Sequence, residues 1–416
     1  MKFSKLSLHD WRQFDKIEID FHPRLTVITG ANGAGKSTLL RLLSQHYGWS
    51  YPLLATPTYS TDGALNYVSG LFKLLKKKET SPTTTVGEFA YSDGQVSKLT
   101  VPAVNSITYN ASIDPPVPIS GLHIGSHRPV PNYQQVGNIP TNAIGAEQAY
   151  QLYHQETMQR YQNSYTQFSP VYRMKEAIIS MATFGPGNQY VQRNERVAKL
   201  FEDFKKVLAK TLPNTIGFKD INIRIPDVVI VTNTGDFIID AASGGLMSLI
   251  DLSWQIFLYS HDKDEFVVTI DEPENHLHPS MQRALLTRLL SAFPNAQFIV
   301  ATHSPFIVSS VKDSVVYVLG YNPSDNVDET GINSRVSSLK LDNANKAGTA
   351  SEILRDVLGV PVTLPEWAED DLRRISGDFQ IENLNSEGIV QLHQRLDEAG
   401  LGEYYPEALR QIAALR

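Results

Sequence analysis

Cysteine is absent from the 416-residue sequence. This absence excludes disulfide bonds, thiolate metal sites and cysteine nucleophiles, and it is typical of proteins in a reducing compartment. The sequence also lacks an uninterrupted apolar run of the ~18–20 residues that a membrane span requires. The segment Met1–Leu8 has no apolar core of the kind found in signal peptides. We therefore expect a cytoplasmic protein that has no membrane partner.

A large excess of one charge is missing as well, because the formal net charge is only −7. Contact with nucleic acid, which the sequence leaves open, would therefore need a local basic patch. There is no internal repeat, and no heptad pattern is long enough for a coiled-coil arm. The fractions of apolar residues (42%) and charged residues (19%) are those of an ordinary globular protein with two or three structural units.

The most informative stretch that is present is a glycine-rich run, Gly30-Ala31-Asn32-Gly33-Ala34-Gly35-Lys36-Ser37, followed by Thr38. A β-branched run over 25–28 predicts a strand before it, and an amphipathic pattern over 38–43 predicts a helix after it. In this context the glycines let successive backbone N–H groups face one anion at a helix N-terminus. Lys36 would contact the β- and γ-phosphates, and the Ser37 hydroxyl would hold Mg²⁺. The sequence therefore predicts a nucleotide-binding protein.

Two acidic residues follow a second apolar run. Residues 266–270 predict a buried strand, and Asp271-Glu272 come directly after it. Carboxylates at the C-terminal end of such a strand lie where an α/β sheet binds its ligand. Asp271 would bind Mg²⁺, and Glu272 would orient and deprotonate the attacking water. A solvated strand end is the alternative, and the phosphate loop argues against it.

Two further segments carry candidate phosphate-binding groups. Ser243-Gly244-Gly245 precede an apolar helical pattern over 244–260, so Ser243 would cap a helix whose N-terminus can bind an anion. Taken alone, Ser-Gly-Gly is a common turn. His303 ends the next predicted strand and could hydrogen-bond the γ-phosphate, although a core or surface histidine is the alternative.

The remaining patterns divide the chain into regions. Strands that alternate with helices after a phosphate loop predict an α/β protein with a largely parallel, doubly wound core. We expect this core to comprise residues 1–50 and 215–345, with a strand-rich and loop-rich insert over 51–142. Within that insert, the patterns predict a helix over 65–78 and a hairpin over 86–101. Helical patterns predict a helical insert over 143–214 and a helical region over 346–416.

Taken as a set, these motifs resemble the ABC-type ATPase heads of the SMC, Rad50 and RecF group. Within that group they are most similar to the ATPase half of the OLD-like (overcoming lysogenization defect) AAA proteins. The resemblance covers residues 1–50 and 215–320 and is poor between them. It implies a P-loop NTPase of the ABC/SMC head type, with a mixed β-sheet, a helical insertion and a C-terminal helical tail.

The resemblance also implies roles for individual residues. It makes Gly30–Thr38 Walker A, Asp271-Glu272 Walker B, Ser243–Gly245 the signature, His276–His278 the D-loop region and His303 the switch histidine. The cofactors it implies are ATP and Mg²⁺, and the implied catalytic residues are the Walker B glutamate and the switch histidine. It further implies a dimer or higher oligomer in which each signature caps the ATP that the other subunit holds.

Two features depart from the family pattern. Leu246 follows the two glycines where the SMC-type pattern has an acidic or amide residue, which bears on the hydrolysis rate. OLD proteins carry a Toprim nuclease domain after the ATPase, whereas the region here is short and its Asp370-Asp371 pair lies on a helical pattern. We therefore expect no nuclease site in this chain and a separate effector protein as a partner.

Four residue groups have roles that the sequence leaves open. Trp11, Arg12 and Phe14 could flank the adenine or form a core with a surface arginine. His276 and His278 could bind zinc, although no third ligand is near and the D-loop accounts for both. The remaining groups are Lys73 with Lys76–Lys78, which could contact DNA or end a solvated helix, and Gln134 with Gln135, the weak candidates for a glutamine loop.

Two functions of different classes fit these features. The first is an ATP-driven dimeric ATPase that controls a separate effector, with DNA repair or anti-phage defence as the settings that analogy suggests. The second is a slowly hydrolysing, nucleotide-gated scaffold or sensor that holds an effector, which Leu246 favours. The ATPase subunit of a membrane transporter is disfavoured by residues 274–279 and by the long insert.

Overall fold

The computed structural model describes residues 1–59, 63, 65–68, 83–102, 106–128, 132–162, 164–323, 334–342, 348–358, 365–379 and 385–414. The chain forms two compact units, Met1–Ala350 and Ser351–Arg416. Within the described residues, no helix combines the length and the apolar character needed to cross a bilayer.

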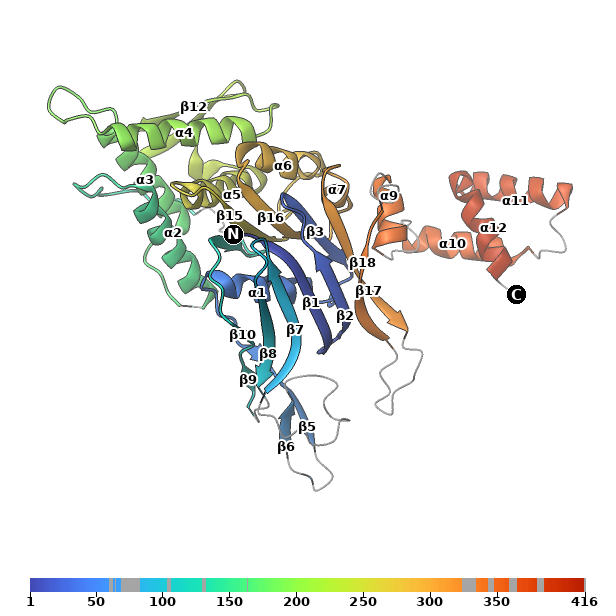
Figure 1. Ribbon diagram of the computed structural model, residues 1–416. Helices are drawn as coiled ribbons and strands as arrows, with labels where there is room; N and C mark the ends of the chain where they lie inside the picture. Colours follow the sequence, from blue (N-terminus) through green and yellow to red (C-terminus); the bar gives the residue numbers. More distant parts are fainter. Residues whose placement is uncertain are drawn as a thin grey trace. The chain divides into compact units, whose positions relative to one another are not determined.

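A mixed sheet of eleven described strands runs through the first unit (Figure 1). In order across the sheet these are β10 (Ser112–Asp114), β8 (Val96–Pro102), β7 (Thr83–Tyr91), β1 (Phe3–Trp11), β2 (Phe14–Asp20), β18 (Ser334–Lys340), β17 (Val315–Pro323), β3 (Leu25–Gly30), β16 (Ala296–Ala301), β15 (Phe266–Asp271) and β11 (Gly121–Ile124). The neighbours from β17 through β3, β16 and β15 to β11 are parallel, and those from β10 to β2 are antiparallel. The mixed sheet is thus confirmed, whereas the largely parallel core predicted from strand–helix alternation is wrong.

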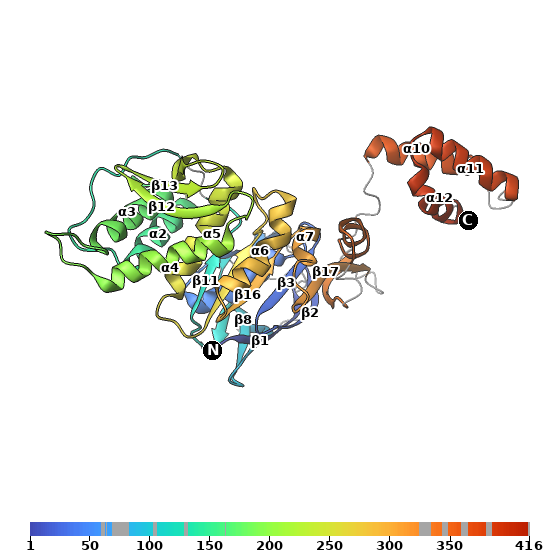
Figure 2. The same cartoon turned by 90° about the horizontal axis from the view of Figure 1, so that it is seen from above.

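The parallel strands position the functional loops. Every residue of β3, β15 and β16 is buried, as expected for parallel strands that are covered on both faces. Asp271 pairs with Ala301, and Ala301 pairs with Ile28, so the C-terminal ends of these strands are level. Helix α1 (Lys36–Ser44) packs against all three. Figure 2 shows that α5 (Gly244–Ser260) and α6 (Pro279–Ala292) lie together on one side of these strands.

Four strands between residues 83 and 124, namely β7, β8, β10 and β11, belong to this same sheet. The hairpin of β7 and β8 turns at Asp93-Gly94, where the sequence predicts it, and β7 pairs with β1. At the other edge, β11 pairs with β15. The predicted boundary at residue 50 therefore assigned strands of the core sheet to the insert. Periodicity predicts that a segment is a strand, but it does not say which distant strand will pair with it.

The predicted helix over 65–78 begins as a strand instead. Leu65–Val68 form β6, which pairs with β5 (Thr56–Tyr59) in a small separate sheet. Short apolar runs fit both a helical and a strand period, which explains the wrong assignment. The rest of that segment, with Lys73 and Lys76–Lys78, lies outside the described residues. A second small sheet joins β4 (Leu53–Leu54) to β9 (Thr108–Tyr109).

A helical layer follows β11 in the chain, as predicted. It consists of α2 (Ala146–Tyr161), α3 (Pro170–Phe184), α4 (Glu195–Thr211) and α5, with a sheet of β12 (Phe218–Arg224), β13 (Asp227–Thr232) and β14 (Phe237–Ile238). Side-chain caps define where three of these helices begin. Ser169 accepts from Tyr172 N, and Asn194 accepts from Val197 N. The third cap, Ser243, begins α5.

The second unit is helical, as predicted. Its described elements are α9 (Ala350–Glu352), a π-helical turn (Ile353–Val357), α10 (Glu366–Gly377), α11 (Ser386–Glu398), a 3₁₀ turn (Gly402–Tyr404) and α12 (Tyr405–Ala414). Its own apolar core includes Leu372, Leu392, Leu396 and Ile412. The Asp370-Asp371 pair lies on α10.

Candidate functional site

The glycine-rich loop adopts a conformation that only glycine permits at several positions. Gly30, Gly33 and Gly35 have φ angles of +137°, +79° and +98°. A Cβ atom on Gly30 would lie 2.3 Å from the Leu319 carbonyl oxygen. A Cβ atom on Gly35 would lie 2.4 Å from Cζ of Phe14. The loop is therefore shaped by close contact with β17 and with the tip of the β1–β2 hairpin.

The loop presents a solvent-accessible rim and a buried base. Ala31, Asn32 and Gly33 are exposed, whereas Ala34 belongs to the core. Helix α1 begins after Gly35, and within the described residues no side chain caps its N-terminus. The first N–H groups of this helix are thus free to bind an anion. This arrangement fits the phosphates of a nucleotide.

Lys36 holds its amine at the centre of the loop. The residue is only 5% exposed, and Nζ donates to the carbonyl oxygens of Gly30 and Ala31 at 3.0 Å each. Burial lowers the pKa of the amine, and the charges of Asp271, Glu272 and Glu274 act in the opposite direction. The amine therefore lies among three carboxylates that approach it from the end of β15.

Asp271 ends β15 with one carboxylate oxygen uncompensated. The residue is 9% exposed, and its Oδ1 has no hydrogen-bond partner within the described residues. Burial raises the pKa of this carboxyl group, against a hydrogen bond from Ser37 and the charge of Lys36. A buried carboxylate oxygen beside a serine hydroxyl is a donor set that suits Mg²⁺. The residues present therefore fit the cation that the sequence predicts.

Glu272 lies at a strained position immediately after the strand. Its φ angle is +47°, which is unusual for a residue other than glycine. Its N–H donates to the Ala301 carbonyl at 2.9 Å. Its Oε2 accepts from Nδ2 of Asn275 at 3.0 Å. The backbone and Asn275 together fix the direction in which this carboxylate points.

Glu274 links the segment Thr302–His303 to the end of β15 by hydrogen bonds. Its Oε1 accepts from the Thr302 hydroxyl at 2.7 Å and from His303 N at 2.8 Å. Burial raises the pKa of Glu274, and its Oε2 has no partner among the described residues. Burial and the charge of Lys36 lower the pKa of His303, which favours a neutral imidazole. The histidine thus lies where the charges of Lys36 and Glu272 act on it.

The Ser-Gly-Gly segment contacts a different part of the site. Ser243 caps α5, and its Oγ accepts from Leu246 N at 3.4 Å. A Cβ atom on Gly245 would lie 2.9 Å from the His276 carbonyl oxygen. In the part of the chain that is described, no hydrogen bond or ion pair joins Ser243–Gly245 to residues 30–38. The structure therefore brings together the other predicted site residues and leaves this segment exposed beside His276.

The alternatives for the hairpin tip and the amides are resolved by burial and contacts. Trp11 is 1% exposed and Phe14 is 0% exposed, so both are core residues. Arg12 is half-buried, with its guanidinium 5.9 Å from the centroid of the Trp11 ring. Gln134 donates to the Gln167 carbonyl and accepts from Ser169 N. These contacts place Gln134 at the start of α3.

Three contributors to the site were not identified as such from the sequence. Glu274 and Asn275 come shortly after the Walker B pair in the sequence. An acidic side chain and an amide side chain at that place were the signal by which they could have been identified. Arg128 carried no such signal, because its guanidinium reaches Asp271 O only through the fold. His278, considered above as a zinc ligand, hydrogen-bonds through Nδ1 to Ser280 Oγ at 2.9 Å and caps α6.

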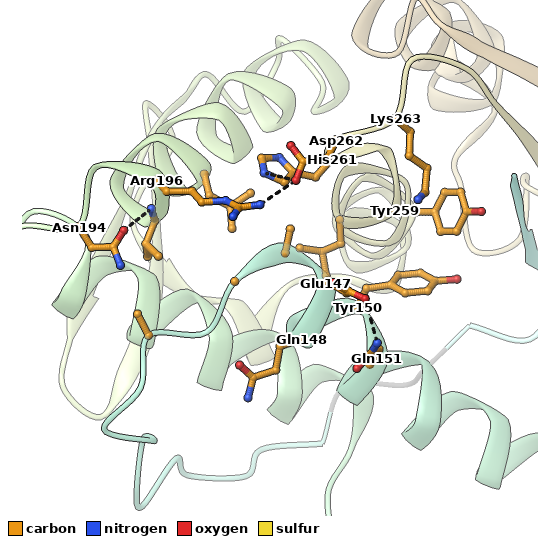
Figure 3. Close-up of a pocket in the computed structure, with 16 residues that line it drawn as sticks. Glu147, Gln148, Tyr150, Gln151, Asn194, Arg196, Tyr259, His261, Asp262 and Lys263 are labelled. Atoms are coloured by element: carbon orange, nitrogen blue, oxygen red, sulfur yellow. Dashed lines mark hydrogen bonds and ion pairs between the residues drawn. The ribbon is translucent and has the colours of Figure 1, made fainter.

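A cavity of about 740 Å³ lies elsewhere, among α2, α4 and α5 (Figure 3). Val197, Leu200 and Leu258 form an apolar floor, and Arg196 and Asp262 make an ion pair of 2.8 Å at its rim. None of its lining residues belongs to the phosphate loop or to the acidic strand end. The cavity is therefore distinct from the candidate nucleotide site.

Two protein-family models match the chain on either side of the inserts. Residues 196–309 match the family described as "AAA domain, putative AbiEii toxin, Type IV TA system", and residues 5–54 match a family described as "AAA domain". Together the two matches contain the phosphate loop, the acidic strand end, the Ser-Gly-Gly segment and His303. Over these two segments, which together make up less than half of the chain, the sequence is similar to AAA domain families.

Curated relatives match parts of this chain. It is 26% identical over 200 residues to the Septu protein PtuA of Bacillus thuringiensis, which is 45% of this chain and 48% of that protein. It is 27% identical over 139 residues to the Retron Ec83 probable ATPase of Escherichia coli, which is 32% of this chain and 25% of that protein. The matches thus span about half or less of the relatives' lengths. Among solved structures, an SmcHead bound to the C-winged helix domain of ScpA aligns with 83% of this chain and 100% of that chain, at 15% identity and a TM-score of 0.45.

Proposed function

We propose that this ATPase binds ATP with Mg²⁺, hydrolyses it in a site shared between two copies of the chain, and thereby controls a separate effector protein. One observation carries the proposal. Lys36, Ser37, Asp271, Glu272 and His303 converge at the level ends of β3, β15 and β16, beside a loop in which a Cβ atom at Gly30 or Gly35 would clash. Phosphoryl transfer requires this combination of anion-binding backbone, fixed cation and acidic residues.

Each residue has a distinct task in the proposed reaction. The loop backbone over 30–38 and the amine of Lys36 would bind the β- and γ-phosphates. Ser37 and Asp271 would hold Mg²⁺, which supplies neutralisation of the charge on the phosphates. Glu272 would accept a proton from the attacking water, with Asn275 holding its carboxylate in place.

His303 would act as a neutral hydrogen-bond donor to the γ-phosphate. Its backbone N–H is held by Glu274, which fixes the segment next to the acidic strand end. Because burial and Lys36 lower the pKa of this histidine, the neutral form is favoured at physiological pH. A neutral imidazole can donate a hydrogen bond from one ring nitrogen and accept one at the other.

The shared site rests on the exposed N-terminus of α5. Ser243 and Gly244 are exposed, and a helix N-terminus behind two glycines is suited to bind a phosphate. Because this segment makes no hydrogen bond to its own phosphate loop within the described residues, we propose that it binds the γ-phosphate held by a second copy. Dimerisation around ATP would then complete two such sites.

The setting is proposed from the relatives. A Septu protein and a retron ATPase are among the relatives, and from this likeness we propose anti-phage defence rather than DNA repair as the setting. We further propose a cytoplasmic location and an effector carried by another chain. The basic run over 76–78 lies outside the described residues and adds no support for nucleic-acid binding.

A slowly hydrolysing scaffold is the second candidate, because Leu246 follows the signature glycines. Turnover separates the two functions. A rate below roughly one per minute, against the about 10 s⁻¹ that is typical of enzymes, together with stable ATP-bound oligomers would favour the scaffold.

Substitution of the proposed general base tests the reaction itself. Glu272→Gln should still bind ATP but should lose hydrolysis by about 10²-fold or more, since a positioned base contributes about that factor. Glu265→Gln is the matched control, because Glu265 lies just before the opposite end of β15 and pairs with Lys2. Wild-type turnover in Glu272→Gln would place the base elsewhere.

A further inference from the structure

Lys175 is a buried lysine whose ammonium group has three hydrogen-bond acceptors. It lies on α3, and its Nζ donates to the two carboxylate oxygens of Asp240 at 2.9 Å and 2.8 Å. Nζ also donates to the Gln134 carbonyl oxygen at 2.6 Å. An ammonium group has three N–H donors, so these three acceptors satisfy it. The side chain of Lys175 is 0% exposed and that of Asp240 is 2% exposed, and the two residues therefore form a buried ion pair.

Asp240 lies directly before the signature in the chain. It is the middle residue of a 3₁₀ turn, Ile239–Ala241, and Ser243 begins α5 shortly after that turn. Ile239 and Ala242 are buried, and the Ala242 N–H donates to the Ile239 carbonyl oxygen at 3.2 Å. The ion pair thus attaches the turn that precedes the signature to α3.

The signature itself is exposed at Ser243 and Gly244. Ser243 accepts from its own helix, at Oγ from Leu246 N at 3.4 Å and at its carbonyl oxygen from Met247 N at 2.8 Å. These two bonds form the first turn of α5, whereas the ion pair at Asp240 holds the chain before that turn. The place of Ser243 at the surface therefore depends on the turn to which it is joined.

A role beyond stability is suggested by the chemistry of such pairs. Apolar side chains of similar volume often replace a buried ion pair without loss of stability, so the pair is weak evidence for stabilisation. Its hydrogen bonds have defined directions, which apolar contacts lack. The bonds of Lys175 to Asp240 can therefore fix a geometry that packing alone would leave loose.

We propose that Lys175 is a positioning residue for the signature. Through Asp240 it fixes the turn before Ser243, so that the N-terminus of α5 faces the γ-phosphate held by a second copy of the chain. This inference rests on the proposed shared site, and it adds a residue of the helical layer on which that site depends.

The test removes both charges at once, by Lys175→Met together with Asp240→Leu. No unpaired charge is then left buried, so the fold should be kept. The affinity of the monomer for a fluorescent ATP analogue should stay close to the wild-type value, since the phosphate loop is unchanged. Dimerisation with a non-hydrolysable ATP analogue, measured by sedimentation, should weaken by about 10- to 100-fold, as expected when a distant change misplaces a binding group.

Mixing experiments provide a readout that general destabilisation would not move. The double variant keeps its Lys36 loop, so its mixture with Lys36→Ala should regain ATPase activity, because Lys36→Ala supplies an intact signature. Its mixture with Ser243→Arg should stay near the activity of the variants alone, because neither chain then has a correctly placed signature.

Two further variants complete the comparison. Arg173→Met is the matched control on the same helix, since its ion pairs of 3.0 Å and 2.9 Å end on Glu156 of α2 and Glu176 of α3. It should lower the thermal unfolding temperature without weakening dimerisation. Asp240→Asn keeps an oxygen acceptor for Lys175 and should show a smaller loss of dimerisation with the same result in the mixtures, and it decides the question if the double variant does not fold.

The outcomes distinguish this inference from the proposed function. Wild-type dimerisation by the folded double variant, or the same activity in the two mixtures, would overturn the positioning role and leave the shared site standing. A wild-type chain that does not dimerise with ATP would instead overturn the shared site.

Discussion

Replacement of Gly35 by alanine should disrupt the phosphate loop in a way that the structure makes quantitative. The residue has a φ angle of +98°, and a Cβ atom there would lie 2.4 Å from Phe14 Cζ and 2.6 Å from Gln13 Nε2. Phe14 is 0% exposed, so its ring has no open space to enter. The loop or the hairpin tip must therefore move.

The cost has two parts. A left-handed backbone conformation costs a residue other than glycine about 1–2 kcal/mol. Forcing a methyl group into a packed site costs about 1–3 kcal/mol more. Gly48→Ala is the matched control, because Gly48 has a φ angle of +89° but no described atom lies within 4 Å of its Cβ position. The control should incur the backbone cost alone.

Denaturant unfolding and titration with a fluorescent ATP analogue measure the two consequences. Gly35→Ala should be destabilised by about 2–5 kcal/mol. It should also lose ATP affinity, because the backbone N–H groups of the phosphate loop no longer converge on one anion. Gly48→Ala should lose about 1–2 kcal/mol and keep its ATP affinity. If Gly35→Ala matched Gly48→Ala in both measurements, the packing argument for this loop would be refuted.

Three further changes test other parts of the structure. Lys36→Ala should keep the fold but weaken ATP binding by at least about 100-fold, since two charge-assisted hydrogen bonds from the amine to the phosphates, of about 1.5–3 kcal/mol each, are lost. An unchanged affinity in equilibrium titration would contradict the assignment of the phosphate loop. Ser243→Arg should abolish ATP-dependent dimerisation while leaving the ATP affinity of the monomer nearly unchanged, and a monomer that no longer binds ATP would show that the signature acts within one chain. Burial lowers the pKa of His46 from 6.5 to about 4, so on acidification the unfolded chain takes up the proton before the folded chain does. The contribution of His46 to the free energy of unfolding should therefore fall by about 3 kcal/mol as the pH drops from 6.5 to 4, and it should not change above pH 6.5. The free energy of unfolding of His46→Gln should show a correspondingly shallower pH dependence over that range, and an unchanged slope would contradict the assignment.

The sequence was most informative where function constrains a short segment. The glycines of the phosphate loop, the buried run before Asp271 and the cap at Ser243 each determine their own local structure, so the strand ends and helix starts around them were predicted close to their observed bounds. Lys36, Asp271 and His303 lie at the same end of the sheet. Their roles in hydrolysis stay predictions.

Pairing between distant segments could not be read from periodicity. The strand β7 has the alternating pattern of a hairpin, but its place beside β1 depends on packing of both faces. Arg128 has no local motif, because the Asp271 carbonyl that its guanidinium contacts lies on β15, far away in the sequence. Leu65–Val68 could not be assigned for another reason. So short a run fits both a helical and a strand period, and only its pairing with β5 shows that it is a strand.

We propose that ATP is hydrolysed in a site built from two copies of the chain. Mixing Ser243→Arg with Lys36→Ala tests it most directly, because a mixed dimer pairs the intact Lys36 loop of one subunit with the intact Ser243 of the other. ATPase activity should appear in the mixture well above that of either variant alone. A mixture in which mixed dimers are shown to form, yet whose activity does not exceed the mean of the two variants, would contradict the claim.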